Sequence, residues 1–438
     1  MAAADGATRE VGPDATADYT TRLVVVRPTD PDTFSGTVVV EWLNVTAGFD
    51  MPVEWIMTHR EIVRRGHAYV GVSAQRVGIE GQPASAFPPV GVGALKEADP
   101  QRYQPLTHPG DAFAFDIFSQ AGRAARESEP GGLLGPLTAE QVIAAGESQS
   151  AMFLTTYVAE VDTLAGVYDG FLIHSRFGMA APLHGNMILG MLLGPRAVTL
   201  PADLARPVVT LLAENDVLGW PPVPGFLAAR QADVANLRAW EIAGTAHADT
   251  YIIGGGFLDS GEQPVEKLAE VFAPTTDSLV GQFDQPINSA PQHHYVAQAA
   301  LRQLVRWVKT GQAAPAAPPL EVNEASPLTL ATDEHGLAKG GVRTPWVDVP
   351  TTVLSGVGNS GNPLAGMVGV GTPFEAATLN RLYPGGKADY LAKFEPSLDA
   401  AIHNGFLLAD DREEILAIAS INFEKALAAA RSGDSSDE

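Results

Sequence analysis

The sequence contains no cysteine among its 438 residues. Disulfide bonds, thiolate nucleophiles and cysteine-based metal sites are therefore excluded. Basic residues are also few, because 28 lysines and arginines stand against 51 aspartates and glutamates, which gives a formal net charge of −23. The phosphates of nucleic acids and anionic membrane surfaces repel a chain this acidic, so we expect neither as a partner.

Long apolar runs are absent as well. No run approaches the length of a membrane span, and residues 1–14 hold no apolar stretch typical of a signal peptide. We therefore expect a cytoplasmic protein that does not enter a membrane, although a precursor trimmed of its leader would give the same sequence. Hydrophobic residues in total make up 45% of the chain, which is enough for a sizeable core.

Short apolar segments alternate with helical patterns along most of the chain. Near-continuous apolar strands separated by helices indicate a mostly parallel sheet with helices on both faces, so the predicted fold class is α/β. Strands are expected over residues 19–27, 37–43, 68–74, 141–145, 168–174, 207–213 and 237–242. Helices are expected over residues 54–65, 111–127, 151–158 and 295–310.

The segments outside this pattern predict the domain organisation. Residues 1–17 are expected to be a flexible N-terminus and residues 18–319 the core, with insertions at about 175–206 and 254–292 that can form a cap. A proline-rich stretch at 313–319 precedes residues 320–430, expected as a C-terminal extension packed on the core. Residues 431–438 are polar and acidic, which predicts a disordered tail.

One pentapeptide, Gly146-Glu147-Ser148-Gln149-Ser150, stands between a predicted strand and a predicted helix. A serine on a sharp strand-to-helix turn is typical of the nucleophile of hydrolases. The turn needs small residues around the serine, and Ser150 is small enough to replace the usual second glycine. We predict Ser148 as a nucleophile, with an ordinary turn serine as the alternative.

An acid and a histidine follow two later strands, in the order Ser, Asp, His that is typical of α/β-hydrolases. A serine hydroxyl needs a base within hydrogen-bond reach and an acid that orients the base. We predict His247 as general base and then acid, and Asp216 as the orienting carboxylate. Glu214 is the alternative acid, but Asp216 lies nearer the exit of the strand. Asp249 is predicted to be a local cap.

Two backbone N–H groups are expected to bind the oxyanion of a tetrahedral intermediate. One belongs to Gln149, directly after the nucleophile. The other lies in the loop after the strand at 37–43, at Asn44 or Val45. The predicted substrate pocket comprises Met179, Leu183, Met187, Leu189, Met191 and Leu192, with ordinary cap packing as the alternative. His174 is a further pocket candidate, with a hydrogen-bonded core histidine as the favoured alternative.

Two further motifs are interpreted as structural. His293 and His294 open a helix with no carboxylate at ligand spacing, so neither a metal nor a cofactor is expected. Residues 356–361 match G-x-G-x-x-G, but Asn362-Pro363 follows where a dinucleotide site needs a helix, so a loop is predicted.

Several stretches together resemble the bacterial proteins called "alpha/beta hydrolase domain-containing". The resemblance implies an α/β-hydrolase fold and hydrolysis of carboxylic esters. It also implies that residues 320–438 belong to the family unit, and it matches the three candidate residues above. The stretches that carry it are residues 38–45, 70–75, 108–111, 116–120, 146–150, 244–249, 286–289 and 341–346.

These observations predict a serine carboxylic-ester hydrolase that works through an acyl-enzyme on a small to medium, largely apolar ester. An acyltransferase with the same three residues is one alternative, and a non-catalytic binding protein is another. Product analysis with an added alcohol distinguishes the acyltransferase from the hydrolase. An unreactive Ser148 would indicate the binding protein.

Overall fold

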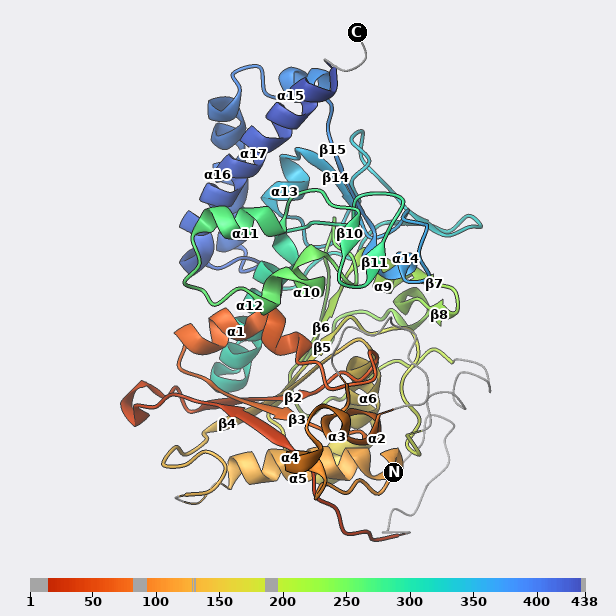
Figure 1. Ribbon diagram of the computed structural model, residues 1–438, viewed down its shortest axis with the longest axis vertical. Helices are drawn as coiled ribbons and strands as arrows, with labels where there is room; N and C mark the ends of the chain where they lie inside the picture. The colour runs from red at the N-terminus through yellow and green to blue at the C-terminus, as the bar shows by residue number, and fades with distance from the viewer. Residues whose placement is uncertain (1–14, 82–92, 128, 130, 186–195, 435–438) are drawn as a thin grey trace.

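The computed structural model describes residues 15–81, 93–127, 129, 131–185 and 196–434. Most of the predicted N-terminal segment therefore lies outside the described residues. The chain forms a central sheet flanked by helices, and the C-terminal helices stack at one end of the molecule (Figure 1). Within the described part of the chain, no helix is both long and apolar enough to cross a membrane.

The central sheet has seven strands in the order β1-β3-β2-β4-β5-β6-β9. All neighbouring strands are parallel except β1, which pairs antiparallel with β3 at one edge. The mostly parallel sheet predicted from the sequence is therefore confirmed. Its strands are β1 (Leu23–Val26), β2 (Thr37–Trp42), β3 (Ala68–Val72), β4 (Gln141–Glu147), β5 (Gly170–His174), β6 (Val208–Leu212) and β9 (Leu237–Glu241).

Helices cover both faces of this sheet. Successive side chains of a strand point to opposite faces, so neighbouring residues of one strand pack against different helices. Val39 of β2 belongs to a buried cluster with residues of α1 (Val53–Arg64) and α12 (Gln292–Thr310). Its neighbours Val38 and Val40 belong to a second cluster, with α5 (Ala114–Arg126) and α6 (Gln149–Thr156). In Figure 1, α1 and α12 lie above the sheet and α5 lies below it.

Short elements fill the connections between the strands. Two-stranded hairpins and single-turn helices predominate among them. They are α2 (Arg76–Glu80), α3 (Leu95–Ala98), α4 (Pro100–Tyr103), α7 (Asp162–Ala165), α9 (Glu214–Leu218), β7 (Gly219–Trp220), β8 (Val223–Pro224), α10 (Thr250–Ile253), α11 (Val265–Val271), β10 (Asp277–Ser278) and β11 (Gly281–Gln282).

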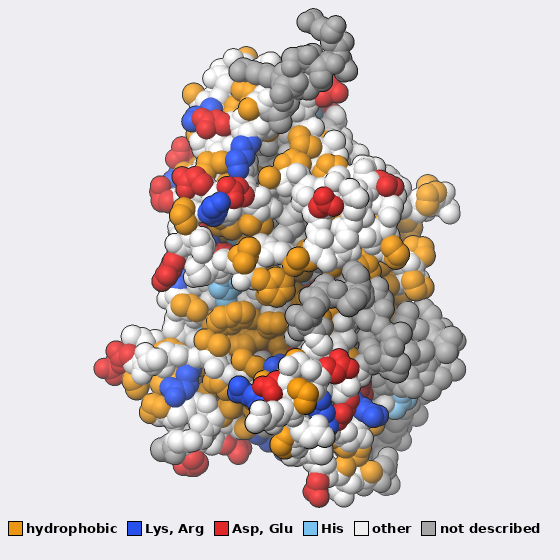
Figure 2. Space-filling model, in the orientation of Figure 1, with side chains coloured by type: hydrophobic (Ala, Val, Ile, Leu, Met, Phe, Trp, Pro, Cys, Tyr) orange, Lys and Arg blue, Asp and Glu red, His pale blue; other side chains and the backbone are white. Residues whose placement is uncertain are grey.

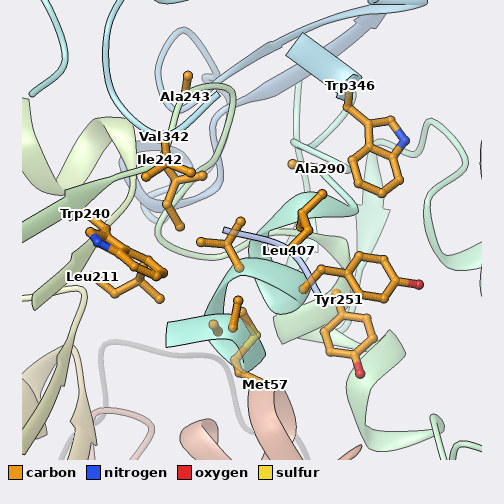
Figure 3. Close-up of a cluster of buried hydrophobic side chains, with 14 of the residues drawn as sticks. Met57, Leu211, Trp240, Ile242, Ala243, Tyr251, Ala290, Val342, Trp346 and Leu407 are labelled. Atoms are coloured by element: carbon orange, nitrogen blue, oxygen red, sulfur yellow. The ribbon is translucent and has the colours of Figure 1, made fainter. Parts of the chain in front are cut away.

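The C-terminal part packs against the same core. Figure 3 shows Trp240 and Ile242, at the end of the sheet, in one buried cluster with Val342, Trp346 and Leu407. Its elements are β12 (Val322–Asn323), β13 (Thr329–Leu330), α13 (Pro345–Asp348), β14 (Thr352–Ser355), α14 (Ala365–Val368), β15 (Val370–Pro373), α15 (Ala376–Leu382), α16 (Lys387–His403) and α17 (Arg412–Asp434).

Two features of this part bear on the sequence predictions. The glycine-rich stretch 356–361 lies in the connection between β14 and β15, outside any helix, as predicted. The tail predicted from residue 431 begins inside α17, which continues to Asp434. Residues 435–438 lie outside the described residues.

Candidate functional site

Ser148 occupies a sharp turn between the end of β4 and the start of α6. Its backbone has φ 58° and ψ −116°, a conformation that costs a non-glycine residue free energy and is held by its surroundings. The Ser148 N–H donates to the His174 carbonyl at 3.0 Å, which ties the turn to β5. A Cβ on Gly146 would lie 3.3 Å from the backbone and Cβ of Ser150, so the turn has room for small residues only.

Three polar side chains form a hydrogen-bonded row at this turn. Ser148 Oγ lies 2.9 Å from His247 Nε2, and His247 Nδ1 lies 2.6 Å from Asp216 Oδ1. All three residues are buried. The row runs from hydroxyl to imidazole to carboxylate, the arrangement in which an imidazole can accept a proton from the hydroxyl.

The sheet brings these residues together because β4, β6 and β9 are parallel and end at the same edge. Asp216 lies on α9, directly after β6, and its Oδ2 accepts the Ala213 N–H at 2.7 Å. The His247 N–H donates to Asn215 Oδ1 at 2.8 Å, which fixes the loop after β9. The Asp216 side chain and the His247 backbone are thus each fixed by a hydrogen bond with a nearby residue.

Glu214 points away from the imidazole. Its carboxyl group accepts the N–H groups of Gly244 at 2.6 Å and Gly356 at 2.8 Å, and the Ser355 hydroxyl at 3.2 Å. Burial raises the pKa of Glu214 to about 7. Glu214 and Asp216 follow the strand, as the sequence predicted. Both lie on the short helix α9, where residues two apart face different sides.

Glu147 is a neighbour of the row that the sequence analysis did not single out. Its Oε1 lies 3.6 Å from His247 Nε2, and Asn44 Nδ2 donates to its Oε2 and its backbone carbonyl, each at 3.1 Å. Burial raises the pKa of the Glu147 carboxyl well above its ordinary value, and the charges of Asp216 and Glu54 raise it further. The neutral form of Glu147 is therefore favoured beside the imidazole.

The predicted backbone donors are only partly free to bind an anion. The Asn44 N–H is used, because it donates to the Met51 carbonyl at 3.0 Å, and this corrects the prediction for Asn44. The Val45 N–H faces the side-chain Oε1 of Gln149 at 3.4 Å. Gln149 is the first residue of α6, where backbone N–H groups have no carbonyl partner within the helix. Val45 and Gln149 remain as the pair of candidate donors.

A mostly apolar cavity of about 140 Å³ opens beside Ser148 and His247. Its walls come from the loop between β2 and α1, from α10 and the insertion that follows it, and from α14. The lining residues are Asn44, Thr46, Ala47, Phe49, Met51, Val53, Glu147, Ser148, His247, Ala248, Ile252, Ile253, Phe257, Leu279, Val280 and Met367.

The structure places none of the described pocket candidates of the sequence analysis on this cavity. His174 is the last residue of β5 and is fully buried against α1 and α12. Met179 is buried in one hydrophobic cluster with residues of α6, and Leu183 lies on the surface. Met187, Leu189, Met191 and Leu192 lie outside the described residues.

Two aromatic rings flank the imidazole of His247. Phe177 stacks on it with ring centroids 5.4 Å apart, and Trp220 meets it edge-on at 5.1 Å. Phe177 belongs to the first predicted insertion and Trp220 to β7. These rings pack against the imidazole, and His247 is buried.

A second polar chain is buried next to the site. His174 Nδ1 lies 2.8 Å from Glu54 Oε1, His174 Nε2 lies 3.0 Å from His293 Nε2, and His293 Nδ1 lies 3.0 Å from Asp249 Oδ2. His293 thus has a carboxylate partner that sequence spacing did not reveal. Asp249 Oδ1 also accepts two N–H groups of α10, which confirms it as a local cap.

Burial shifts the pKa of two of these four groups. It raises the pKa of Glu54 to about 8 and lowers the pKa of His174 well below its ordinary value. Paired in this way, the four side chains hold one another. In the described part of the chain, no cluster of three or more His, Asp or Glu side chains could hold a metal ion.

Comparison with known protein families places this fold. A family model described as "Alpha/beta hydrolase domain" matches residues 1–417. The chain belongs to this family. The fold is therefore the α/β-hydrolase fold, as the resemblance of the sequence implied, and the row at Ser148 lies where the sheet of this fold meets its loops. A search for similar curated proteins finds no match.

Several solved structures are similar over part of the chain. Est1E from Butyrivibrio proteoclasticus with bound ferulic acid shares 9% identity, covering 51% of this chain and 85% of its own, with a TM-score of 0.30. An esterase from the fungus Rhizomucor miehei shares 14% identity over 69% and 83%, with a TM-score of 0.32. A thermophilic esterase from Thermogutta terrifontis with bound propionate shares 15% identity over 50% and 78%, with a TM-score of 0.28. At such low similarity, no substrate or reaction is carried over.

Proposed function

We propose that this protein is a serine hydrolase of carboxylic esters that works through an acyl-enzyme. One observation carries the proposal: the unbroken row of contacts from Ser148 Oγ through the His247 imidazole to Asp216, at 2.9 and 2.6 Å. A hydroxyl becomes a useful nucleophile at neutral pH when a base and an orienting acid are arranged in this way.

In the first half of the reaction, the Ser148 oxygen attacks the ester carbonyl carbon while its proton passes to His247 Nε2. Asp216 holds the Nδ1–H of the imidazole and stabilises the imidazolium that forms. The tetrahedral intermediate collapses as His247 gives the proton to the leaving alcohol. Water then attacks the acyl group on Ser148, with His247 again as base, and the carboxylic acid is released.

The oxyanion of the intermediate is assigned to the N–H groups of Val45 and Gln149. Substrate would displace the Gln149 side chain from the Val45 N–H, where it rests at 3.4 Å. Loss of one such donor typically costs about 3 kcal/mol of transition-state stabilisation. The apolar cavity beside Ser148 supports a largely apolar ester of small to medium size as substrate.

The experiment compares the hydrolysis of p-nitrophenyl butyrate by the parent protein with that by Ser148→Ala. The proposal expects the rate to fall by about 10³-fold or more in the variant. Undiminished hydrolysis by Ser148→Ala would refute the nucleophile. Adding an alcohol acceptor and analysing products distinguishes hydrolysis, which yields the free acid, from acyl transfer, which yields a new ester.

A further inference from the structure

The cavity beside Ser148 is lined mostly by apolar side chains. Ala47, Phe49 and Ile252 belong to its walls, and Ser148 and His247 are among its few polar lining residues. Its volume of about 140 Å³ is close to the roughly 150 Å³ of a dry protein cavity that holds one benzene molecule. The cavity therefore has room for about six carbon atoms.

The mouth of the same cavity consists of exposed apolar side chains. Phe257 and Leu279 line the cavity but are 53% and 66% exposed, and Leu258, next to Phe257, is 74% exposed. In Figure 2, hydrophobic side chains gather across the middle of the molecule, at the height of α1, α10 and β11 in Figure 1. An exposed apolar patch continuous with a binding cavity is typical of a surface that a ligand covers.

We propose that the cavity and this mouth bind one flexible hydrocarbon chain of the ester substrate. About six carbons fill the cavity, and the rest of the chain lies across Phe257 and Leu279. The mouth presents apolar side chains, so a chain ending in a charged group gains nothing there. This inference rests on the proposed function and narrows its small to medium esters to those with a linear chain of medium length.

Because the cavity and the mouth bury a chain to different extents, kcat/KM should rise with chain length in two steps of different slope. A methylene that becomes fully buried improves kcat/KM by about fourfold. On the mouth, one side of the chain stays in water, so the gain is about twofold for each methylene. kcat/KM therefore rises steeply to about six chain carbons and more gently beyond.

The test has two arms, because the chain can belong to either side of the ester. One arm uses p-nitrophenyl esters of linear acids from acetate to dodecanoate, and the other uses acetates of linear alcohols of the same lengths, all below their micelle concentrations. The parent protein, Phe257→Ser and Leu279→Ser are compared. Leu164→Ser on α7 is the matched control, because Leu164 is 56% exposed and does not line the cavity.

In one of the two arms, kcat/KM of the parent protein is expected to show the two slopes against chain length. That arm tells whether the bound chain belongs to the acyl or to the alkyl side of the ester. The ratio of kcat/KM for the ten-carbon and six-carbon chains should fall towards one in Phe257→Ser and Leu279→Ser. The ratio for the six-carbon and four-carbon chains should persist in both variants, and Leu164→Ser should keep both ratios.

Equal kcat/KM at all lengths in both arms would overturn the inference, as would unchanged ten-to-six ratios in the two mouth variants. Failure of the proposed function has a different signature. It would be the absence of Ser148-dependent hydrolysis for every ester in both arms, acetates included.

Discussion

Ser150 carries a buried hydroxyl for which the described residues offer no hydrogen-bond partner. It stands where hydrolase elbows usually have glycine, so its size is tolerated but its polar atom gains nothing. An unsatisfied buried hydroxyl costs about 1–3 kcal/mol. We predict that Ser150→Ala keeps esterase activity and raises the free energy of unfolding by up to about 1 kcal/mol. Urea denaturation measures this, and a loss of stability would show that the hydroxyl has a partner.

The two acids on α9 allow a matched comparison. Asp216→Ala removes the carboxylate that contacts the imidazole, so we predict that kcat falls by roughly 10³-fold to 10⁴-fold. Glu214→Ala removes contacts to Gly244, Ser355 and Gly356 and none to the imidazole, so its main effect is on stability. Steady-state kinetics and urea denaturation of both variants distinguish these effects. A greater loss of kcat in Glu214→Ala would reverse the assignment of the acid.

Among single residues, the sequence predicted the site residues that directly follow a strand. Ser148, His247 and Asp216 could be placed together because parallel strands end at one edge. Glu147 and Asn215 could not be found, because the former occupies a variable motif position and the latter acts through its side chain on a backbone N–H. The use of the Asn44 N–H by Met51 depends on a loop conformation that periodicity does not encode.

Helix α1 begins without a side-chain cap of its own, since its N-cap is Pro52. Glu41 of β2 replaces the cap, because its carboxyl accepts the N–H groups of Glu54 at 2.9 Å and Trp55 at 3.0 Å. We predict that Glu41→Leu lowers the free energy of unfolding by about 2 kcal/mol. Urea denaturation checks this, with Glu334→Leu at an exposed site as control. Equal stability of the two variants would show that the cap is dispensable.

Strands and long helices were predictable as elements because their apolar periodicity is strong. The short helix α9 was not, since Glu214-Asn215-Asp216 follows a strand and five residues give no helical pattern. The pocket was also beyond prediction. Its walls come from segments far apart in the sequence, and His174 ends a strand with its side chain turned to α1 rather than to the cavity.

Several buried ionisable groups make the stability of the whole molecule depend on pH. Burial raises the pKa of Glu41 and Glu54 to about 8 and that of Glu214 to about 7, and it lowers the pKa of His174 well below its ordinary value. A raised carboxyl pKa contributes stability that is lost as the pH rises from its ordinary value towards the raised one. A lowered histidine pKa costs stability only below about pH 6.5.

Between pH 6.5 and 8 only the carboxyl effect remains, so we predict that the free energy of unfolding falls across this window. Each such carboxyl contributes a slope of up to about 1.4 kcal/mol per pH unit. Urea denaturation at pH 6.5 and 8 measures the fall, and Glu54→Gln should reduce it. A free energy of unfolding that rises over this window would contradict these charge states.

We infer that residues 320–430 fold with the core as one unit. Trp346 and Leu407 share a buried cluster with Trp240, and the backbone of Met367 accepts N–H groups from Asn215 and Ala248 beside the site. The denaturation curves described above should therefore show one cooperative transition. Two separate transitions would indicate an independent C-terminal domain.

The central claim is that the Ser148 hydroxyl is a nucleophile activated by its neighbours. The most direct measurement is labelling of the folded protein with a fluorophosphonate, followed by peptide mapping by mass spectrometry. We expect one phosphonyl group per chain, located on Ser148, and slow labelling in His247→Ala. Modification of a different residue, or an unlabelled Ser148 in the folded parent protein, would contradict the account.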